Sequence, residues 1–367
     1  MTYHILRDTH AAPAHIDIIC PTHNRSAAIR STIDSVFAQT VTDWRLIVVS
    51  DGSSDDTEAQ VLAYDDPRVT VLRCDRHGHP GGPRNIGLAH ADAPYTAYID
   101  HDDEWTPDHL ATLLHVLSEG ADIVATGCVR VSPEGKRTPT DIIDMVWHPE
   151  LQTLTGLNEP SRVGHIGDLP LRVGGWSTEE FGFEDWDLWW RLAEHGYRFS
   201  TVPDHTVLML QSKGTRRETI TARYQVLITE VPDADVATSV LEQLDTPEER
   251  TRMHAYCRTD LIDWHRRMAE SSDYVLPRGA VLEEVLSGLV ARVRRMPPGD
   301  GYAAMFAAPC GDRYGLHLPL WCADRSHAAR IAQLSAERDL RQRARLQGLI
   351  RECIARVGQR EVFGVTG

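Results

Sequence analysis

The sequence lacks three features that would each define a class of protein: an excess of cations, paired cysteines and a long apolar run. Its formal net charge is −15, so no surplus of positive charge is available to replace the counterions of a nucleic-acid backbone. Lysine is nearly absent, since only Lys136 and Lys213 occur among 38 cationic residues. We therefore expect no nucleic-acid partner, and the scarcity of lysine is typical of a GC-rich bacterial genome.

The cysteines and the apolar residues exclude two further classes. The seven cysteines are scattered and form no Cys-x-x-Cys pair, so the sequence indicates neither a disulfide framework nor a zinc site. No stretch approaches the roughly 18 apolar residues of a membrane span, and Met1–Pro13 has no apolar signal region. We expect reduced thiols, a cytoplasmic location and no transmembrane segment.

What is present is an alternation of strand and helix patterns. The 367 residues, 42% of them hydrophobic, suffice for a large α/β domain and a smaller one. From residue 15, β-rich apolar runs alternate with helical periods, which predicts a Rossmann-like, mostly parallel sheet flanked by helices. The expected strands are His15–Cys20, Trp44–Ser50, Val69–Cys74, Tyr95–Ile99 and Asp122–Val129. The expected helices are Ser26–Gln39, Asp55–Tyr64 with a capping box to Glu58, Pro83–Ala91, Pro107–Glu119 and Glu184–His195.

The second half of the chain has a different pattern. Residues 130–175 are rich in Pro, Gly and Thr and suit an irregular loop region. Beyond about residue 230 only helical patterns remain, so we expect a first domain over 1–230 and a mainly helical one over 231–367. The expected helices are 234–244, 247–269, 280–295 and 326–357. The last of these is rich in arginine, and we expect it to pack on its own domain, contact a membrane surface or form a homodimer.

The most informative segment is Tyr98–Trp105, in which four carboxylates follow the apolar run Tyr95–Ile99 directly: Asp100, Asp102, Asp103 and Glu104. Like charges this close repel one another unless a cation or strong hydrogen-bond donors hold them. Hard oxygen ligands suit Mg²⁺ or Mn²⁺, which points to phosphate chemistry. The alternative is an acidic loop that only serves the start of the next helix.

Further polar groups follow the other strands. Thr22 and His23, in the first strand-to-helix loop, are candidates for contacts to a base and a sugar, and Asp51 could accept hydrogen bonds from a base or ribose, unless it only forms an Asp-Gly turn. Arg84 lies in the first turn of its helix, where a cation opposes the helix dipole, so an anionic ligand is expected there. Asp185, beside aromatic residues, is a candidate general base.

Taken in order, these motifs resemble family 2 glycosyltransferases with a GT-A fold over residues 15–200. They are Pro21–Arg25 (Pro-Thr-x-Asn-Arg), Asp51–Thr57 (Asp-Gly-Ser-x-Asp-x-Thr), Arg84–Gly87 (Arg-Asn-x-Gly), Asp100–Asp103 (Asp-x-Asp-Asp), Gly174–Trp176 (Gly-Gly-Trp) and Glu184–Leu192 (Glu-Asp-x-Asp-Leu-x-x-Arg-Leu). Each motif alone is a weak indicator of the family, but the motifs follow one another in the family's order, which makes the resemblance specific.

The resemblance implies an inverting, metal-dependent enzyme that uses a nucleoside-diphosphate sugar and a hydroxyl-bearing acceptor. It implies that the donor nucleotide contacts Thr22, His23, Asn24, Arg25, Asp51, Arg84 and Asp100. Asp102, with Asp100, would hold Mn²⁺ or Mg²⁺, with His101 and His205 as further candidate ligands. Asp185 would be the general base, and the acceptor side would include Trp176, Glu184 and Trp186. A small natural product or a surface glycan is the expected acceptor.

Two rival functions follow from other classes. A sugar nucleotidyltransferase shares the sheet and the acidic site, but it needs a Gly- and Lys-containing loop that Pro21–Arg25 does not provide. A non-catalytic nucleotide-sugar or carbohydrate-binding protein would not need the Glu184–Asp185 pair. We therefore expect a glycosyltransferase.

Overall fold

The computed structural model divides the chain into two compact units, Met1–Ile220 with Ser272–Val281, and Thr221–Ser271 with Leu282–Gly367. The residues that it describes are 2–9, 14–179, 182–211, 224–295, 305–320, 327–331, 333, 348 and 350–355. The sequence predicted a single domain boundary near residue 230, whereas the segment 272–281 belongs to the first unit. This placement is fixed by pairing, because Trp147 and Val275 form an antiparallel bridge.

The first unit is built on a ten-stranded sheet in the order β1-β4-β3-β2-β5-β9-β7-β10-β6, with β8 paired to β7. Strands β2 to β5 run parallel, as do β7 and β10, whereas β1, β6, β8 and β9 pair antiparallel. The strands are β1 (Tyr3–Arg7), β2 (Ile16–Thr22), β3 (Trp44–Asp51), β4 (Val69–Cys74), β5 (Tyr95–Tyr98), β6 (Asp103–Trp105), β7 (Ile123–Val131), β8 (Arg137–Pro139), β9 (Val163–Ile166) and β10 (Phe199–Leu210).

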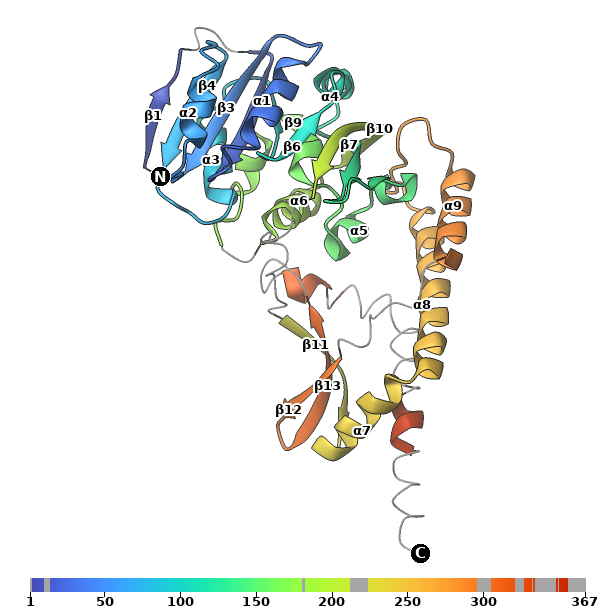
Figure 1. Ribbon diagram of the computed structural model, residues 1–367. Coiled ribbons are helices and arrows are strands. Elements are labelled where there is room, and N and C mark those ends of the chain that lie inside the picture. The colour runs from blue at the N-terminus through green and yellow to red at the C-terminus, as the bar shows by residue number, and fades with distance from the viewer. Residues whose placement is uncertain are drawn as a thin grey trace, which may run out of the picture. The chain divides into compact units, whose positions relative to one another are not determined.

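Helices cover both faces of this sheet (Figure 1). Along β2, Ile18 belongs to the core cluster that includes residues of α1, α2 and α4, whereas Ile19 belongs to the cluster of α6, as the alternation of a strand requires. A smaller cluster joins Ile86 of α3 to β3 and β4. The helices are α1 (Ile29–Phe37), α2 (Thr57–Leu62), α3 (Gly81–His90), α4 (His109–Ser118), α5 (Pro149–Leu154) and α6 (Glu184–Glu194), with short 3-10 turns at Ile142–Met145, Pro160–Arg162 and Leu169–Val173.

The predicted fold class, a mostly parallel sheet flanked by helices, is confirmed. Two local predictions differ. The segment 130–175 contains β9, which pairs with both β5 and β7 in the interior of the sheet. The expected capping box of the second helix is also wrong, because Glu58 accepts a hydrogen bond from the Ser50 hydroxyl at 2.7 Å and pairs with Arg73. A carboxylate held by a buried partner is not available to cap a helix.

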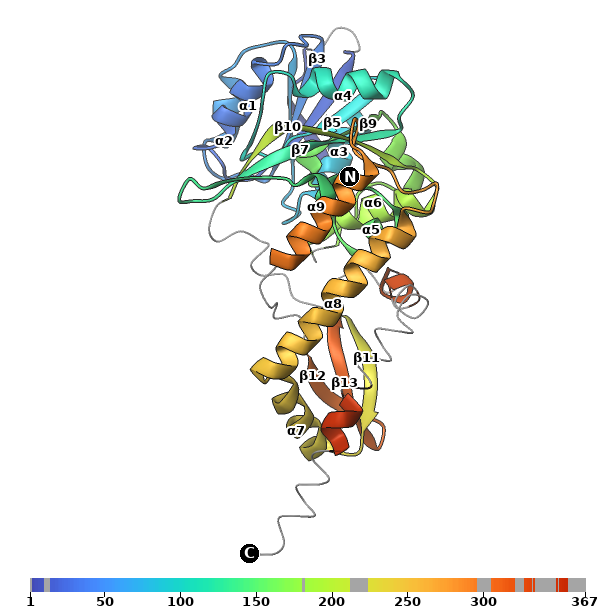
Figure 2. The same ribbon diagram turned by 90° about the vertical axis from the view of Figure 1, so that its right-hand side faces the viewer.

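The second unit contains an antiparallel sheet in the order β11-β13-β12. Its helix α7 contacts all three strands, and the long α8 contacts α9 (Figures 1 and 2). The elements are β11 (Tyr224–Val231), β12 (Phe306–Cys310), β13 (Arg313–Leu320), α7 (Ala234–Leu244), α8 (Pro247–Met268) and α9 (Leu282–Arg295). The helices at 234–244, 247–269 and 280–295 match the sequence pattern, whereas β12 and β13 were not expected in the mainly helical region 231–367.

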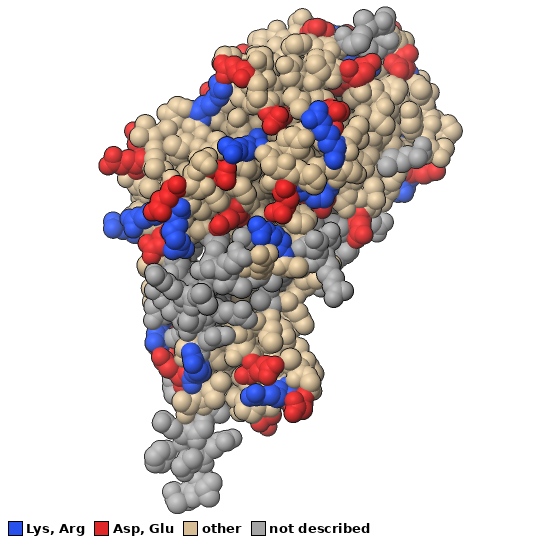
Figure 3. Space-filling view, turned by 180° about the vertical axis from the view of Figure 1, so that it is seen from behind, with Lys and Arg blue, Asp and Glu red and all other residues tan. Residues whose placement is uncertain are grey.

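Most of the expected helix 326–357 lies outside the described residues, including Arg338, Arg341, Arg343 and Arg345. Of its described residues, Ile350 and Cys353 belong to the core of the second unit. Among the helices that the structure describes, none is both long and apolar enough to cross a membrane. On the face drawn in Figure 3, the charged side chains of the described residues alternate in sign rather than form one basic surface.

Candidate functional site

The predicted polar residues gather where the parallel strands end. Strand β2 pairs in parallel register with β3 on one side and with β5 on the other. Their carboxyl ends therefore bring Thr22–Arg25, Asp51 and the acidic loop Asp100–Asp102 to one edge of the sheet, which is where open α/β sheets bind ligands.

The first two loops are bonded to each other. A ring nitrogen of His23 lies 2.8 Å from the Asp51 carbonyl oxygen, and the Asn24 side chain accepts a hydrogen bond from the Ser54 amide at 2.8 Å. Asn24 has a φ of 47°, a left-handed conformation that asparagine tolerates better than most residues. The Arg25 amide donates to the Thr57 hydroxyl at 2.7 Å. His23, Asn24 and Arg25 thus belong to a fixed rim of the site.

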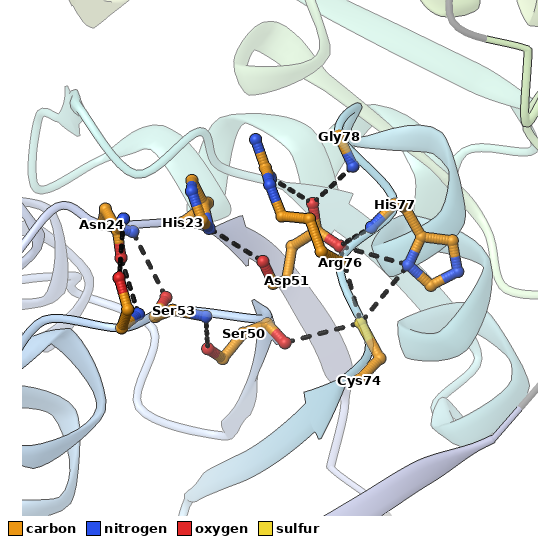
Figure 4. A network of polar contacts seen from close by, with 10 residues as sticks. His23, Asn24, Ser50, Asp51, Ser53, Cys74, Arg76, His77 and Gly78 are labelled. Carbon is orange, nitrogen blue, oxygen red and sulfur yellow. Dashed lines mark hydrogen bonds and ion pairs between the residues drawn. The ribbon is translucent and has the colours of Figure 1, made fainter.

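The carboxylate of Asp51 is buried and its two oxygens are fully engaged (Figure 4). Oδ1 accepts from the His77 amide at 2.6 Å and lies 3.1 Å from the His77 ring. Oδ2 accepts from the Arg76 guanidinium at 2.6 Å and from the Gly78 amide at 3.1 Å. Asp51 was expected to accept directly from a base or ribose. In this arrangement the carboxylate instead holds residues 76–78 in place, and Arg76 is the partner exposed toward solvent.

Arg84 connects the acidic loop to α6. Its guanidinium is buried, donates to Asp100 Oδ1 at 2.7 Å and lies 3.5 Å from Glu184 Oε1. Burial alone would lower the pKa of Arg84, but the charges of Asp100 and Glu184 outweigh it and raise that pKa. The guanidinium also lies 4.5 Å above the Trp176 ring. The expected anionic partner of this first-turn cation is therefore, in part, a pair of carboxylates of the chain itself.

The glycines before Arg84 serve internal packing. A Cβ atom on Gly81 would lie 2.0 Å from the Ser177 carbonyl oxygen, and one on Gly82 would lie 2.3 Å from the ring of His77. Both positions are therefore restricted to glycine by the protein's own atoms.

The four carboxylates of the acidic segment have different surroundings. Asp102 is partly exposed, at 30% of its side chain, and lies 4.0 Å from the Arg25 guanidinium. Asp103 is buried, accepts from the Ser161 hydroxyl at 2.6 Å and belongs to β6. Burial, and then the charges of Asp100 and Asp102, hold the pKa of Asp103 well above its usual range. Glu104 pairs with Leu208 in the sheet, so Asp100 and Asp102 remain as candidate metal ligands.

His101 is not suited to bind a metal. Its Nε2 accepts from the Arg25 guanidinium at 3.0 Å, and a guanidinium can only donate, so the ring proton of the neutral form sits on Nδ1. Burial lowers the pKa of His101 to about 4, with the Asp100 charge acting in the opposite direction. The ring is neutral at pH 7 and neither nitrogen offers a free lone pair, which corrects the suggestion of a histidine ligand here.

His205 is a second correction. Its Nε2 lies 2.8 Å from the Thr140 carbonyl oxygen. In the pairing of β10 with β6, Val207 faces Trp105 and Met209 faces Asp103, so Asp102 faces the region of Leu210. A separation of five residues along a strand is about 17 Å, and His205 is too far from Asp102 to share a metal ion with it.

Three buried polar atoms at this edge lack a hydrogen-bond partner among the described residues: Thr22 Oγ1, Arg84 Nε and His101 Nδ1. Buried polar groups in native proteins are normally satisfied, and an exception calls for an explanation. Two of these atoms are donors and the hydroxyl can donate as well. Unused donors beside carboxylates are what a bound, oxygen-rich ligand would satisfy.

The candidate base lies at the start of α6. Asp185 follows Glu184, the partner of Arg84, and its Oδ1 accepts from the Trp186 amide at 2.7 Å. Asp187 is used structurally, since it pairs with Arg191 at 2.6 Å, and Arg191 in turn bonds the Gly175 carbonyl at 2.7 Å. The carboxylates of this first turn therefore have different partners. Asp185 directly follows Glu184, which pairs with Arg84.

The tryptophans expected on the acceptor side are packed inside. Trp176 is buried and its indole donates to the Tyr98 hydroxyl at 3.3 Å. Trp186 is buried as well and donates to the Gln152 carbonyl at 2.7 Å. Neither ring is free to stack on a sugar, so the expectation of direct acceptor contact is wrong for these two side chains as they stand. Both side chains are part of the buried interior.

Ser161 was not predicted from the sequence. Its hydroxyl accepts from the Asp100 amide at 3.0 Å and donates to Asp103 at 2.6 Å, so it positions the acidic loop from a segment that was expected to be irregular. Its backbone carbonyl accepts from the Trp105 indole at 2.8 Å. The only sequence signal is a serine in a Pro-Ser-Arg turn, which carries no pattern of its own.

Residues 17–167 match the model of Glycosyl transferase family 2, and this part of the chain belongs to that family. A UDP-Glc:alpha-D-GlcNAc-diphosphoundecaprenol beta-1,3-glucosyltransferase of Escherichia coli is 36% identical over 95 residues, covering 26% of this chain and 38% of that protein. The succinoglycan biosynthesis protein ExoW of Rhizobium meliloti is 39% identical over 103 residues, covering 26% and 32%. The matched segments thus span well under half the length of these relatives.

Among solved structures, S. aureus TarS 1-349 in complex with UDP-GlcNAc is similar with a TM-score of 0.49 and 19% identity, covering 65% of this chain and 69% of that chain. The predicted membership of glycosyltransferase family 2 is confirmed by the family match itself.

Proposed function

We propose that this chain transfers a sugar from a nucleoside-diphosphate sugar to an acceptor hydroxyl, with inversion at the anomeric carbon. The observation that carries the proposal is buried Arg84, which contacts Asp100 at 2.7 Å and Glu184 at 3.5 Å. This contact joins the acidic loop after β5 to the first turn of α6, where Asp185 follows Glu184. One cation thereby holds a candidate donor-binding carboxylate and the residue that precedes the candidate base.

We assign the donor nucleotide to the sheet edge formed by Thr22, His23, Asn24, Arg25, Asp51, Arg84 and Asp100. The unpartnered Thr22 Oγ1, Arg84 Nε and His101 Nδ1 support this assignment, because a nucleoside diphosphate offers many acceptor oxygens. Asp51 would contribute by holding Arg76, whose side chain is 48% exposed, rather than by contacting the base itself.

We propose that Asp102, together with Asp100, holds Mn²⁺ or Mg²⁺. The carboxylate oxygens are hard ligands, and this assignment is supported by the neighbouring Asp103, whose pKa is raised by burial first and then by the charges of Asp100 and Asp102. A bound divalent ion supplies positive charge to the departing diphosphate. His101 and His205 are not included, for the reasons given above.

Asp185 is our proposed general base. It would accept the proton of the acceptor hydroxyl while the hydroxyl oxygen bonds to the anomeric carbon and the bond from that carbon to the diphosphate oxygen breaks. Glu184, paired with Arg84, would fix the first turn of α6 and so the position of Asp185. An attack from the face opposite the leaving group gives inversion.

A saccharide of a surface glycan is the acceptor that we favour. The two relatives named above support this choice, since one name specifies a diphosphoundecaprenol-linked GlcNAc and the other succinoglycan. We further propose a cytoplasmic location, which suits the absence of a disulfide at Cys20, Cys74, Cys128 and Cys310. A dimer or membrane contact through the arginine-rich C-terminal segment stays a prediction.

The function is tested with a panel of nucleoside-diphosphate sugars in the presence of Mn²⁺. One of them should raise the thermal unfolding midpoint, as a ligand that binds only the folded state must, and should release nucleoside diphosphate when an acceptor glycan is added. If no nucleoside-diphosphate sugar binds at millimolar concentration, the transferase proposal is wrong. If one binds and is never turned over with any acceptor, a binding protein is the better description.

A further inference from the structure

Three potential metal ligands meet at the ends of β3 and β4: Asp51, Cys74 and His77 (Figure 4). They come from two strands and the loop that follows the second, so no short sequence motif unites them. Cys74 Sγ lies 3.6 Å from His77 Nδ1 and 3.8 Å from Asp51 Oδ1, and Oδ1 lies 3.1 Å from Nδ1. All three ligand atoms therefore lie within 4.8 Å of one another.

These distances match the edges of a tetrahedral zinc site. Zinc bonds are about 2.3 Å to sulfur, about 2.0–2.1 Å to nitrogen and about 2.0–2.2 Å to oxygen. In a tetrahedral site these bonds separate the ligand atoms by about 3.6 Å for sulfur and nitrogen, about 3.4 Å for nitrogen and oxygen, and about 3.6 Å for sulfur and oxygen. Each measured separation lies within a few tenths of an ångström of its edge. Small side-chain rotations would suffice to bind the ion.

The surroundings of the three side chains are those of a prepared site. Asp51 Oδ2 is held by Arg76 at 2.6 Å and by the Gly78 amide at 3.1 Å, and Oδ1 accepts from the His77 amide at 2.6 Å while it also faces the other two ligand atoms. The His77 ring lies against Gly82, where a Cβ atom would approach it to 2.3 Å. Supporting contacts that orient ligands in this way are typical of metal sites.

We propose that Asp51, Cys74 and His77 form a second metal site, selective for Zn²⁺ or another borderline-soft divalent ion, with a fourth position open to water. A thiolate and an imidazole favour zinc over the Mg²⁺ or Mn²⁺ expected at Asp102. Binding forms one bond each to sulfur, nitrogen and oxygen, and releases the thiol proton to water, while the His77 proton resides on Nε2. The two negative ligands neutralise the ion.

The Cys74 thiol donates to the Ser50 carbonyl oxygen at 3.4 Å, and a bound metal ion would replace that proton. The absence of any Cys-x-x-Cys pair had indicated no zinc site, and this inference depends on residues that only the fold brings together.

The test uses the purified full-length chain, stripped of metal with a chelator. Zn²⁺ affinity is measured by competition with a chromophoric chelator, and Co²⁺ is added in place of zinc to reveal sulfur coordination by a thiolate-to-cobalt absorption band. The wild type should show the band. Cys74→Ser and His77→Gln should each weaken zinc binding by more than the 10- to 100-fold typical of losing a supporting residue, and Cys74→Ser should abolish the band.

Two matched controls make the result specific. Cys310→Ser removes a partly exposed thiol of the second unit and should leave the band and the zinc affinity unchanged. Asp102→Ala should leave the thiolate-to-cobalt band unchanged, because Asp102 offers no sulfur ligand. A wild type without the band, or variants with wild-type affinity, would overturn the zinc site. The assay uses neither donor nor acceptor, so its failure would leave the transferase proposal untouched.

Discussion

The guanidinium of Arg84 donates to Asp100 at 2.7 Å while it also lies 3.5 Å from Glu184, one hundred residues further along the chain. Both contacts are made by a side chain that is 2% exposed. These two ion pairs depend on the guanidinium, because its removal would leave negative charge in a poorly solvated environment.

Arg84→Met should therefore destabilise the first unit by about 3–5 kcal/mol, the range found when one partner of a buried ion pair is removed. Urea denaturation measures the change. The exposed pair of Arg172 with Asp168 at 2.7 Å provides a matched control, since Arg172→Met should leave the free energy of unfolding nearly unchanged. Equal effects of the two substitutions would show that Arg84 does not hold the site together.

Asp185→Asn should lower the turnover number by about 10²–10⁴, the contribution typical of a general base, while leaving the affinity for the nucleoside-diphosphate sugar nearly unchanged. The amide keeps the shape of the side chain and its ability to accept the Trp186 amide hydrogen bond. Calorimetry of donor binding and a transfer assay separate the two effects. Transfer at the wild-type rate would rule out Asp185 as the base.

Asp102→Ala should weaken nucleotide binding only when Mn²⁺ is present, because the variant removes a ligand of the metal and not of the nucleotide. The measurement is calorimetric titration of the nucleoside diphosphate with and without Mn²⁺. The comparison variant is His101→Gln, which removes a ring that the geometry excludes as a ligand, and it should retain the metal dependence. If wild-type affinity is the same with and without metal, Asp102 does not hold a catalytic ion.

His165 should make the protein lose stability as the pH falls. Burial lowers the pKa of His165 to about 4, below the value of about 6.5 for an unfolded chain. Between these values the unfolded state binds more protons, so the free energy of unfolding decreases as pH drops from 6.5 toward 4. The contribution of His165 between pH 7 and pH 4.5 is about 2–3 kcal/mol.

His165→Gln should flatten that decline, as measured by urea denaturation at pH 7 and pH 4.5. His115→Gln is the control, because the His115 side chain is 70% exposed and should not alter the pH dependence. His101 and His109, whose pKa values burial lowers to about 4 and about 3, account for a decline that remains in the variant. An unchanged slope in His165→Gln would contradict the assignment.

The sequence by itself predicted the strands β2, β3, β4, β5 and β7, the helices α1 to α4 and α6, and the motifs at the strand ends. Alternating and helical periods are local properties, and the helix α7 and the strand starting at Trp44 begin where the pattern predicted. The family was also predicted from local motifs, because the order of the motifs along the chain can be read without knowing which residues are in contact.

Only the tertiary structure decided which polar groups have partners. It placed Ser161 under the acidic loop, directed both oxygens of Asp51 inward, and buried the indoles of Trp176 and Trp186. It also brought Cys74 beside His77 and Asp51. Hydrogen bonding and desolvation depend on distances between segments far apart in the chain, and no periodicity or spacing encodes those distances.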